Sequence, residues 1–131
     1  SAALQGYNYL LKNFCDRRLL NSMLDFVSME NIYFEKATDS DFYKLVGKEV
    51  FSIKTDGNNS ALTDEALRYI PLIVGLRELD LEWAIQVTDE GIKELALALS
   101  LVYVDLSFCN NVSEHAISML IAKNGNIKIE R

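Results

Sequence analysis

The chain has 131 residues, which fits a single domain, or one domain with a small cap, and argues against a two-domain enzyme. Half of the residues are hydrophobic and 24% are charged, so the composition is that of a globular protein rather than a disordered one. The 19 Asp and Glu outnumber the 13 Lys and Arg, giving a net charge of −6. Because nucleic-acid binding depends on a positive surface, DNA, RNA and anionic membranes are disfavoured as main partners.

The cysteines and the apolar stretches bear on the cellular environment. Cys15 and Cys109 form no CxxC or Cys/His ligand spacing, so we expect neither a disulfide framework nor a zinc site. An intracellular, reducing location follows, with the cytoplasm or nucleus favoured over the mitochondrion. The longest apolar stretch, around residues 95–104, is far shorter than the roughly 20 residues of a membrane span, so no membrane insertion is expected. A start at Ser1 without a leader pattern indicates a processed form or a fragment.

Residues 1–30 do not repeat and are predicted to form a helical cap. Two apolar runs with helical spacing carry this prediction: Leu4, Tyr7, Leu10, Leu11 and Phe14, then Leu19, Leu20, Met23, Leu24, Phe26 and Val27. A cap of this kind covers the apolar edge of the first unit of a repeat domain.

From residue 31 onward, a pattern returns every 25 residues. Its first column holds a hydroxyl residue followed by an acid: Thr38-Asp39, Thr63-Asp64, Thr88-Asp89 and Ser113-Glu114. Three of the four threonines of the chain fall in this column. A hydroxyl that caps an N–H group, followed by a carboxylate at the positive end of the helix dipole, predicts a helix start. Apolar residues four and seven positions after each hydroxyl residue give each helix one buried stripe: Phe42 and Leu45, Leu67 and Ile70, Ile92 and Leu95, Ile117 and Leu120.

Short alternating segments precede the helices and are predicted to be strands. They cover residues 32–34, 51–53, 79–81 and 104–106, with a fifth at 127–129. The first and last residue of each triplet are expected to point inward. A strand and a helix every 25 residues fit the leucine-rich repeat period. The predicted fold is therefore α/β: a short right-handed leucine-rich repeat solenoid over residues 31–131, with a parallel sheet on its concave face and helices outside.

The last two repeats carry a more specific resemblance. Leu79 corresponds to Val104, and Ala84 corresponds to Cys109. The string VDLSFCNNVSEHAI resembles the cysteine-containing subclass of leucine-rich repeats, typical of F-box/leucine-rich-repeat substrate receptors of ubiquitin ligases. The pattern spans about three quarters of the chain. Only one unit has the cysteine, residues 56–60 are expected to insert an extra turn, and residues 1–30 lack the Leu-Pro opening of an F-box.

Candidate chemical residues favour structural roles. His115 is the only histidine and has no nucleophile or carboxylate partner at a motif spacing. In the repeat pattern, Cys109 turns inward beneath a loop, where its thiol reaches a carbonyl, and Cys15 lies beside an apolar stripe. The acids of the first column repeat once per unit rather than converging on one point, so they are expected to cap helices rather than bind metal. We therefore predict no catalytic residue, no metal and no cofactor.

The outward strand positions and their flanks form the candidate protein-binding surface on the concave face. The candidates are Tyr33, Glu35, Ser52, Lys54, Glu78, Asp80, Glu82, Tyr103, Asp105 and Ser107, with Asn31 and Val50 in the same set of positions. Equivalent residues of neighbouring strands lie about 4.8 Å apart, so these side chains would form an acidic face with two tyrosines. The alternative is an ordinary solvated sheet face. Trp83 and Phe108 occupy equivalent loop positions and are expected to pack under the loops; if they are exposed, they extend the contact surface.

The sequence thus predicts a non-enzymatic interaction module that binds a protein partner, preferably a basic one, through its concave face. The resemblance implies a substrate-receptor or adaptor role in a ubiquitin ligase. One alternative is a small subunit or assembly factor of a larger complex, a mitochondrial one included, similar to coupling factor B-type proteins of ATP synthase. Another is an inhibitor or regulator of a basic enzyme.

Overall fold

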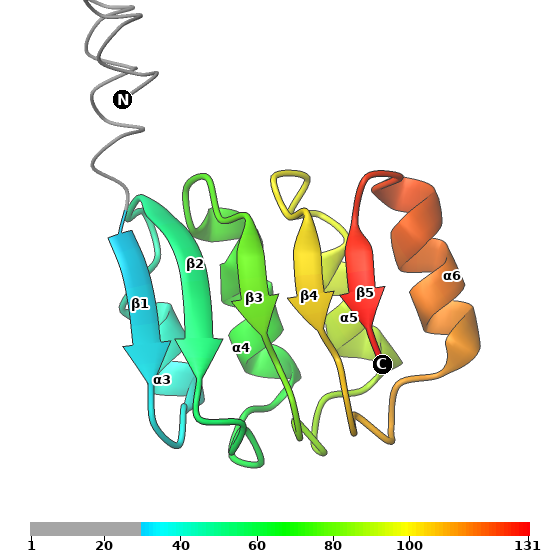
Figure 1. Ribbon diagram of the computed structural model, residues 1–131, viewed down its shortest axis with the longest axis horizontal. Helices are drawn as coiled ribbons and strands as arrows, with labels where there is room; N and C mark the ends of the chain where they lie inside the picture. Colours follow the sequence, from blue (N-terminus) through cyan, green and yellow to red (C-terminus); the bar gives the residue numbers. More distant parts are fainter. Residues whose placement is uncertain (1–29) are drawn as a thin grey trace, which may run out of the picture.

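The computed structural model describes residues 30–131 of the chain (Figure 1). Residues 1–29 of the predicted helical cap, Cys15 included, therefore lie outside the described residues, and Glu30, predicted as part of the cap, instead begins the first strand. The elements follow one another in the order β1 (Glu30–Phe34), α3 (Asp39–Tyr43), β2 (Val50–Thr55), α4 (Asp64–Tyr69), the 3-10 helix η1 (Ile70–Leu72), β3 (Glu78–Asp80), α5 (Asp89–Leu95), β4 (Tyr103–Asp105), α6 (Glu114–Lys123) and β5 (Lys128–Glu130).

The five strands form one parallel sheet whose order, β1-β2-β3-β4-β5, is that of the sequence. Helices alternate with the strands and lie behind the sheet in the view of Figure 1. The front face of the sheet is covered by none of the described helices, and we call it the open face. The predicted α/β alternation and all five predicted strands are confirmed, with bounds that differ by at most two residues at either end.

The four predicted helix starts are also confirmed. Thr38, Thr63, Thr88 and Ser113 are the N-caps of α3, α4, α5 and α6. Each hydroxyl oxygen accepts a hydrogen bond from a backbone N–H in the first turn, which satisfies one of the donors that a helix start leaves free.

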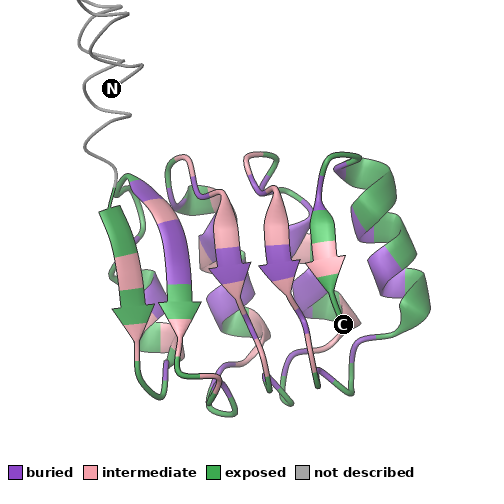
Figure 2. Cartoon of the chain, viewed as in Figure 1, coloured by how far each residue is buried: buried purple, intermediate pink, exposed green. Residues whose placement is uncertain are grey.

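The core lies between the sheet and the helices, and Figure 2 colours the buried residues of both layers purple. The apolar stripe predicted for each helix is buried, from Phe42 and Leu45 in and after α3 to Ile117 and Leu120 in α6. The sheet contributes the central residues of its strands, of which Ile53, Leu79 and Val104 are fully buried. Successive repeats therefore share one continuous core.

Strand β2 departs from the predicted alternation. The ladder between β1 and β2 pairs Glu30 with Val50 and then Asn31 with Ser52, so Phe51 is an extra residue in β2. Such a bulge changes the face to which the preceding residue points. Val50 is 1% exposed, so its predicted outward position was wrong.

The loop after β2 also differs from the sequence expectation. The ladder aligns Ile53 with Leu79, and these residues precede their N-caps, Thr63 and Thr88, by ten and nine positions. This loop is therefore one residue longer than its neighbour, rather than longer by a turn. Within the described part of the chain, no helix has both the length and the apolar composition needed to cross a bilayer.

Candidate functional site

The structure brings most of the predicted surface residues together on the open face. Strand pairing sets Glu78 beside Tyr103 and Asp80 beside Asp105. Strand β5 extends these two rows with Lys128 and Glu130, which the sequence reasoning did not include. The 25-residue period would have predicted both positions, because Lys128 and Glu130 lie 25 residues after Tyr103 and Asp105, their neighbours in β4.

The predicted surface residues of β1 and β2 differ in exposure. Tyr33 is 59% exposed and pairs with Lys54 across the ladder, while Glu35 is exposed just beyond the end of β1. Ser52 is only 3% exposed and donates a hydrogen bond from Oγ to Oδ1 of Asn31, at 2.7 Å. The prediction that Ser52 contacts a partner was wrong, because the residue is buried and its hydroxyl is bonded to Asn31.

Lys54 is already engaged within the face. Its Nζ lies 3.6 Å from Oε1 of Glu78 and 5.4 Å from the centre of the Tyr103 ring. One cation of β2 thus links β3 and β4 through an ion pair and a cation–π contact.

Three carboxylates gather where β3 and β4 end. Ligand oxygens of Asp80, Glu82 and Asp105 all lie within 4.8 Å of one another, and we call this group the acidic cluster. Hydrogen bonds fix two of the three. Oδ2 of Asp80 accepts from the hydroxyl of Thr55 at 2.9 Å, and Oδ1 of Asp80 accepts from the N–H of Glu82 at 2.9 Å. Oδ1 of Asp105 accepts from the N–H of Ser107, also at 2.9 Å.

The electrostatics of the acidic cluster favour a positive neighbour. Burial raises the pKa of the Glu82 carboxyl, and the charges of Asp105 and Asp80 raise it further. Burial and nearby carboxylates also raise the pKa of Tyr103. None of the ion pairs found among residues 30–131 involves a carboxylate of the acidic cluster. A cationic group placed here would reduce the repulsion among the three carboxylates, and it would not have to replace a lysine or arginine of the described residues.

The loops that follow the strands share one backbone feature. The residue four positions after the aligned strand residues Ile32, Ile53, Leu79 and Val104 has a positive φ in every case. These residues are Lys36 (φ 50°), Gly57 (φ 80°), Trp83 (φ 63°) and Phe108 (φ 61°). The left-handed conformation favours glycine and is uncommon for bulky side chains.

Trp83 and Phe108 do not pack under their loops, contrary to the favoured prediction. They stack on each other with ring centroids 4.3 Å apart and planes 13° apart, and they remain 45% and 52% exposed. The N–H of Trp83 donates to the carbonyl of Ser107 at 2.9 Å, which ties the two loops together. The aromatic pair therefore belongs to the surface, at the loop edge of the open face.

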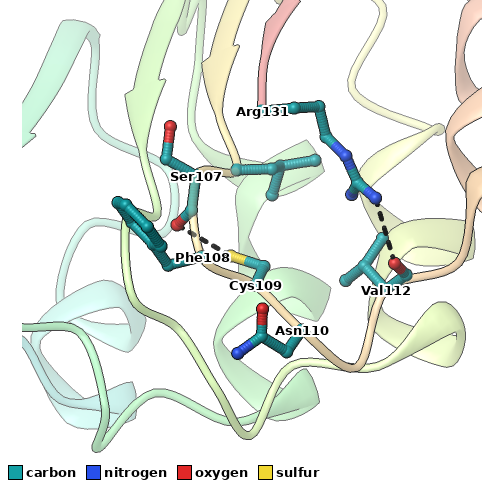
Figure 3. Close-up of a pocket in the computed structure, with 7 residues that line it drawn as sticks. Ser107, Phe108, Cys109, Asn110, Val112 and Arg131 are labelled. Carbon is teal, nitrogen blue, oxygen red and sulfur yellow. Dashed lines mark hydrogen bonds between the residues drawn. The ribbon is translucent and has the colours of Figure 1, made fainter.

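Cys109 lines a cavity of about 340 Å³ at the same edge, together with Phe108 and Arg131 (Figure 3). Its thiol donates to the carbonyl of Leu81 at 3.1 Å, as the repeat pattern predicted. Burial raises the pKa of the Cys109 thiol, which disfavours the reactive thiolate. Arg131 lies across the cavity and donates to Glu114 at 2.6 Å. These contacts support the structural role of Cys109.

His115 lies exposed on α6, beside a hollow of about 590 Å³ between α5 and α6. The described lining of that hollow contains acids, lysines and apolar residues, but no serine, threonine or cysteine that an imidazole would activate. The acids of the first repeat column lie on this helical side, and three of them bond to the next repeat. Oxygens of Asp39, Asp64 and Asp89 accept from Thr63, Thr88 and Ser113, at 2.6 to 2.9 Å.

No protein-family model matches this chain, and a search of curated proteins returned no match either.

Proposed function

We propose that the chain is a short leucine-rich repeat solenoid that performs no chemistry itself and binds a basic segment of a partner protein on its open face. The 25-residue period, the parallel strand order and the helices on one side support the solenoid assignment. The resemblance of residues 104–117 to the cysteine-containing subclass supports it as well.

The acidic cluster is the observation on which the binding proposal rests. Three carboxylates lie within 4.8 Å of one another, partly shielded from water and without a cation among the described residues. Fields of one sign at a surface raise the association rate of an oppositely charged partner, and a paired charge at the interface slows its dissociation. A lysine or arginine side chain of the partner is the complementary group.

Tyrosines flank the acidic cluster and supply apolar contact area. Tyr103 lies beside Glu78 in the sheet, and Tyr33 is exposed at the β1 side. Tyrosine is enriched at protein interfaces because its ring buries apolar area while its hydroxyl stays paired or hydrated. Charge would bring the partner to the face, and the rings would hold it.

The wider role follows the sequence resemblance: we propose the substrate-receptor or adaptor arm of a ubiquitin ligase. Co-purification of the chain with cullin-ligase components, at low and high salt, would support this assignment. Recovery of respiratory-complex subunits instead would favour the assembly-factor role, and recovery of a basic enzyme would favour the inhibitor role.

The binding proposal is tested with a nona-lysine peptide and a charge-neutral variant of the acidic cluster. Asp105→Asn keeps the oxygen that accepts from Ser107, whereas Asp80→Asn keeps only one of the two oxygens that accept from Thr55 and Glu82. Circular dichroism therefore checks first that the variant with Asp80→Asn, Glu82→Gln and Asp105→Asn stays folded. The matched control is Glu65→Gln, Glu90→Gln and Glu94→Gln, which removes the same charge from α4 and α5. We expect calorimetry to give an affinity at least about tenfold weaker for the cluster variant than for the control, because a close charge pair contributes 1.5 kcal/mol or more. Equal affinities would contradict the proposal.

A further inference from the structure

The aromatic pair formed by Trp83 and Phe108 is unusual for a surface loop. Lys36 and Gly57 occupy the same loop position in the first two repeats, so the backbone requires neither an aromatic ring nor a large side chain there. Both aromatic residues nevertheless have a left-handed backbone conformation, which glycine adopts without steric conflict. Trp83 and Phe108 are about half exposed as residues, so the fold gains only part of the stabilisation that two buried aromatics would give.

The surroundings of the pair are negatively charged. Glu82 immediately precedes Trp83 in the chain, and Asp105 and Ser107 precede Phe108 by a few residues. Glu82 and Asp105 both belong to the acidic cluster. The exposed aromatic pair thus follows closely, along the chain, two carboxylates that have no cation partner among residues 30–131.

Two cationic side chains of the described residues, Lys54 and Arg131, contact other groups rather than the aromatic pair. Lys54 lies over the Tyr103 ring and beside Glu78. Arg131, which shares a cavity with Phe108, donates to Glu114 and to the carbonyl of Val112. No cation–π contact to Trp83 or Phe108 is found within the described part of the chain.

We infer that Trp83 and Phe108 form a guanidinium-binding platform, on which an arginine of the partner stacks while its N–H groups pair with Glu82 and Asp105. This inference rests on the proposed function and specifies its chemistry, because it selects arginine over lysine. A guanidinium is planar and weakly hydrated, so it stacks on aromatic faces and pairs with carboxylates through two parallel hydrogen bonds. An ammonium group also lies over a ring, as Lys54 does over Tyr103, but it is compact and strongly hydrated, and it forms neither the flat stack nor the two parallel hydrogen bonds.

The test compares nona-arginine with nona-lysine, two peptides of equal charge. Trp83 is the only tryptophan of the chain, so its fluorescence reports contact at the platform directly. We expect the native chain to bind nona-arginine about three to five times more tightly than nona-lysine, the size of a cation–π contact at an exposed site. Only nona-arginine should quench Trp83 strongly.

The variant that removes the platform is Trp83→Gly with Phe108→Gly, measured by calorimetry. Gly57 shows that glycine fits this loop position, so the circular dichroism spectrum should stay native. Trp83→Asn with Phe108→Asn is the second pair, since asparagine tolerates a left-handed backbone. In both variants the ratio of the affinity for nona-arginine to that for nona-lysine should fall toward one. The affinity for nona-lysine itself should change by less than about twofold.

The outcomes separate the platform from the proposed function. Equal affinity of the native chain for the two peptides, or an unchanged preference in the glycine and asparagine variants, overturns the platform. If the native chain binds basic peptides and the cluster variant does not, the proposal that the open face binds basic segments would still be supported. If the native chain binds neither peptide, both proposals are overturned.

Discussion

The carboxylate of Asp64 accepts two hydrogen bonds from Thr88, one from its backbone N–H at 2.8 Å and one from its hydroxyl at 2.6 Å. Asp64 is the first residue of α4, and Thr88 is the N-cap of α5. The side chain therefore fixes the start of the next helix in the chain. The equivalent contacts from Asp39 to Thr63 and from Asp89 to Ser113 make this link a property of the repeat.

Replacing Asp64 by Ala should destabilise the fold by about 2 kcal/mol, because Thr88 loses two charge-assisted hydrogen bonds. Urea unfolding followed by circular dichroism measures this change. The control is Glu90→Ala on α5, whose carboxylate forms only an exposed ion pair with Lys93 and should change stability by a few tenths of a kcal/mol, about 0.5 at most. Equal effects of the two substitutions would show that the inter-repeat bonds add no stability.

Gly91 has a steric role in α5, and Gly91→Ala should destabilise the protein. A Cβ atom at this position would meet the carboxylate of Asp64 and would lie 2.9 Å from Cδ1 of Leu67. Overpacking of this kind costs about 1–3 kcal/mol, which exceeds the roughly 1 kcal/mol that alanine adds in helix propensity. Gly125→Ala is the matched control, because nothing lies within 4 Å of a Cβ built there. A thermal melt of each variant decides the matter: a native melting temperature for Gly91→Ala would contradict this role.

The hydrogen bonds from Ser113 make the contribution of Asp89 to the free energy of unfolding depend on pH. Hydrogen bonds from the N–H and the hydroxyl of Ser113 lower the pKa of the Asp89 carboxyl below its ordinary value of 3.8. A lowered pKa in the folded state stabilises the protein above the unfolded pKa, and this contribution disappears as pH falls through the folded value. We therefore expect the difference in free energy of unfolding between the native chain and Asp89→Asn to shrink as pH falls below about 4. Urea titrations at several pH values check this, and parallel stability curves would refute it.

The ionised carboxylate of Glu82 should destabilise the fold, in contrast to that of Asp89. Burial and the neighbouring Asp105 and Asp80 raise the pKa of its carboxyl in the folded state. A raised pKa contributes stability only below the unfolded value of about 4.3, and this contribution is lost as pH rises through the folded value. Glu82→Gln should therefore raise the melting temperature at neutral pH and have little effect at acidic pH. Scanning calorimetry at both pH values measures the difference, and a lower melting temperature at neutral pH would contradict the repulsion.

The regular parts of the fold could be predicted because each depends on a short pattern. A hydroxyl residue followed by an acid marks a helix start, and residues four and seven positions on mark the buried stripe, as in α5 with Thr88, Ile92 and Leu95. The link from each aspartate to the next repeat could not be predicted. A carboxylate at a helix start has a sufficient local explanation, and only the stacking of α4 on α5 sets Asp64 beside Thr88.

The candidate surface was predicted less completely, for reasons of backbone geometry. Alternation placed Asp80 and Asp105 on one face correctly, because β3 and β4 are regular. The bulge at Phe51 broke the same rule in β2 and placed Val50 in the core. The exposure of Trp83 and Phe108 depends on the left-handed turn that starts each loop, and hydrophobic periodicity carries no information about φ.

Basic protein segments are proposed to bind on the open face at the acidic cluster. The most direct measurement is a two-dimensional NMR titration of the isotope-labelled chain with nona-lysine, which reports every backbone amide separately. We expect the largest shifts in residues 78–83 and 103–108, where β3 and β4 lead into their loops. Shifts confined to the helices α5 and α6, or no shifts at all, would contradict the proposal.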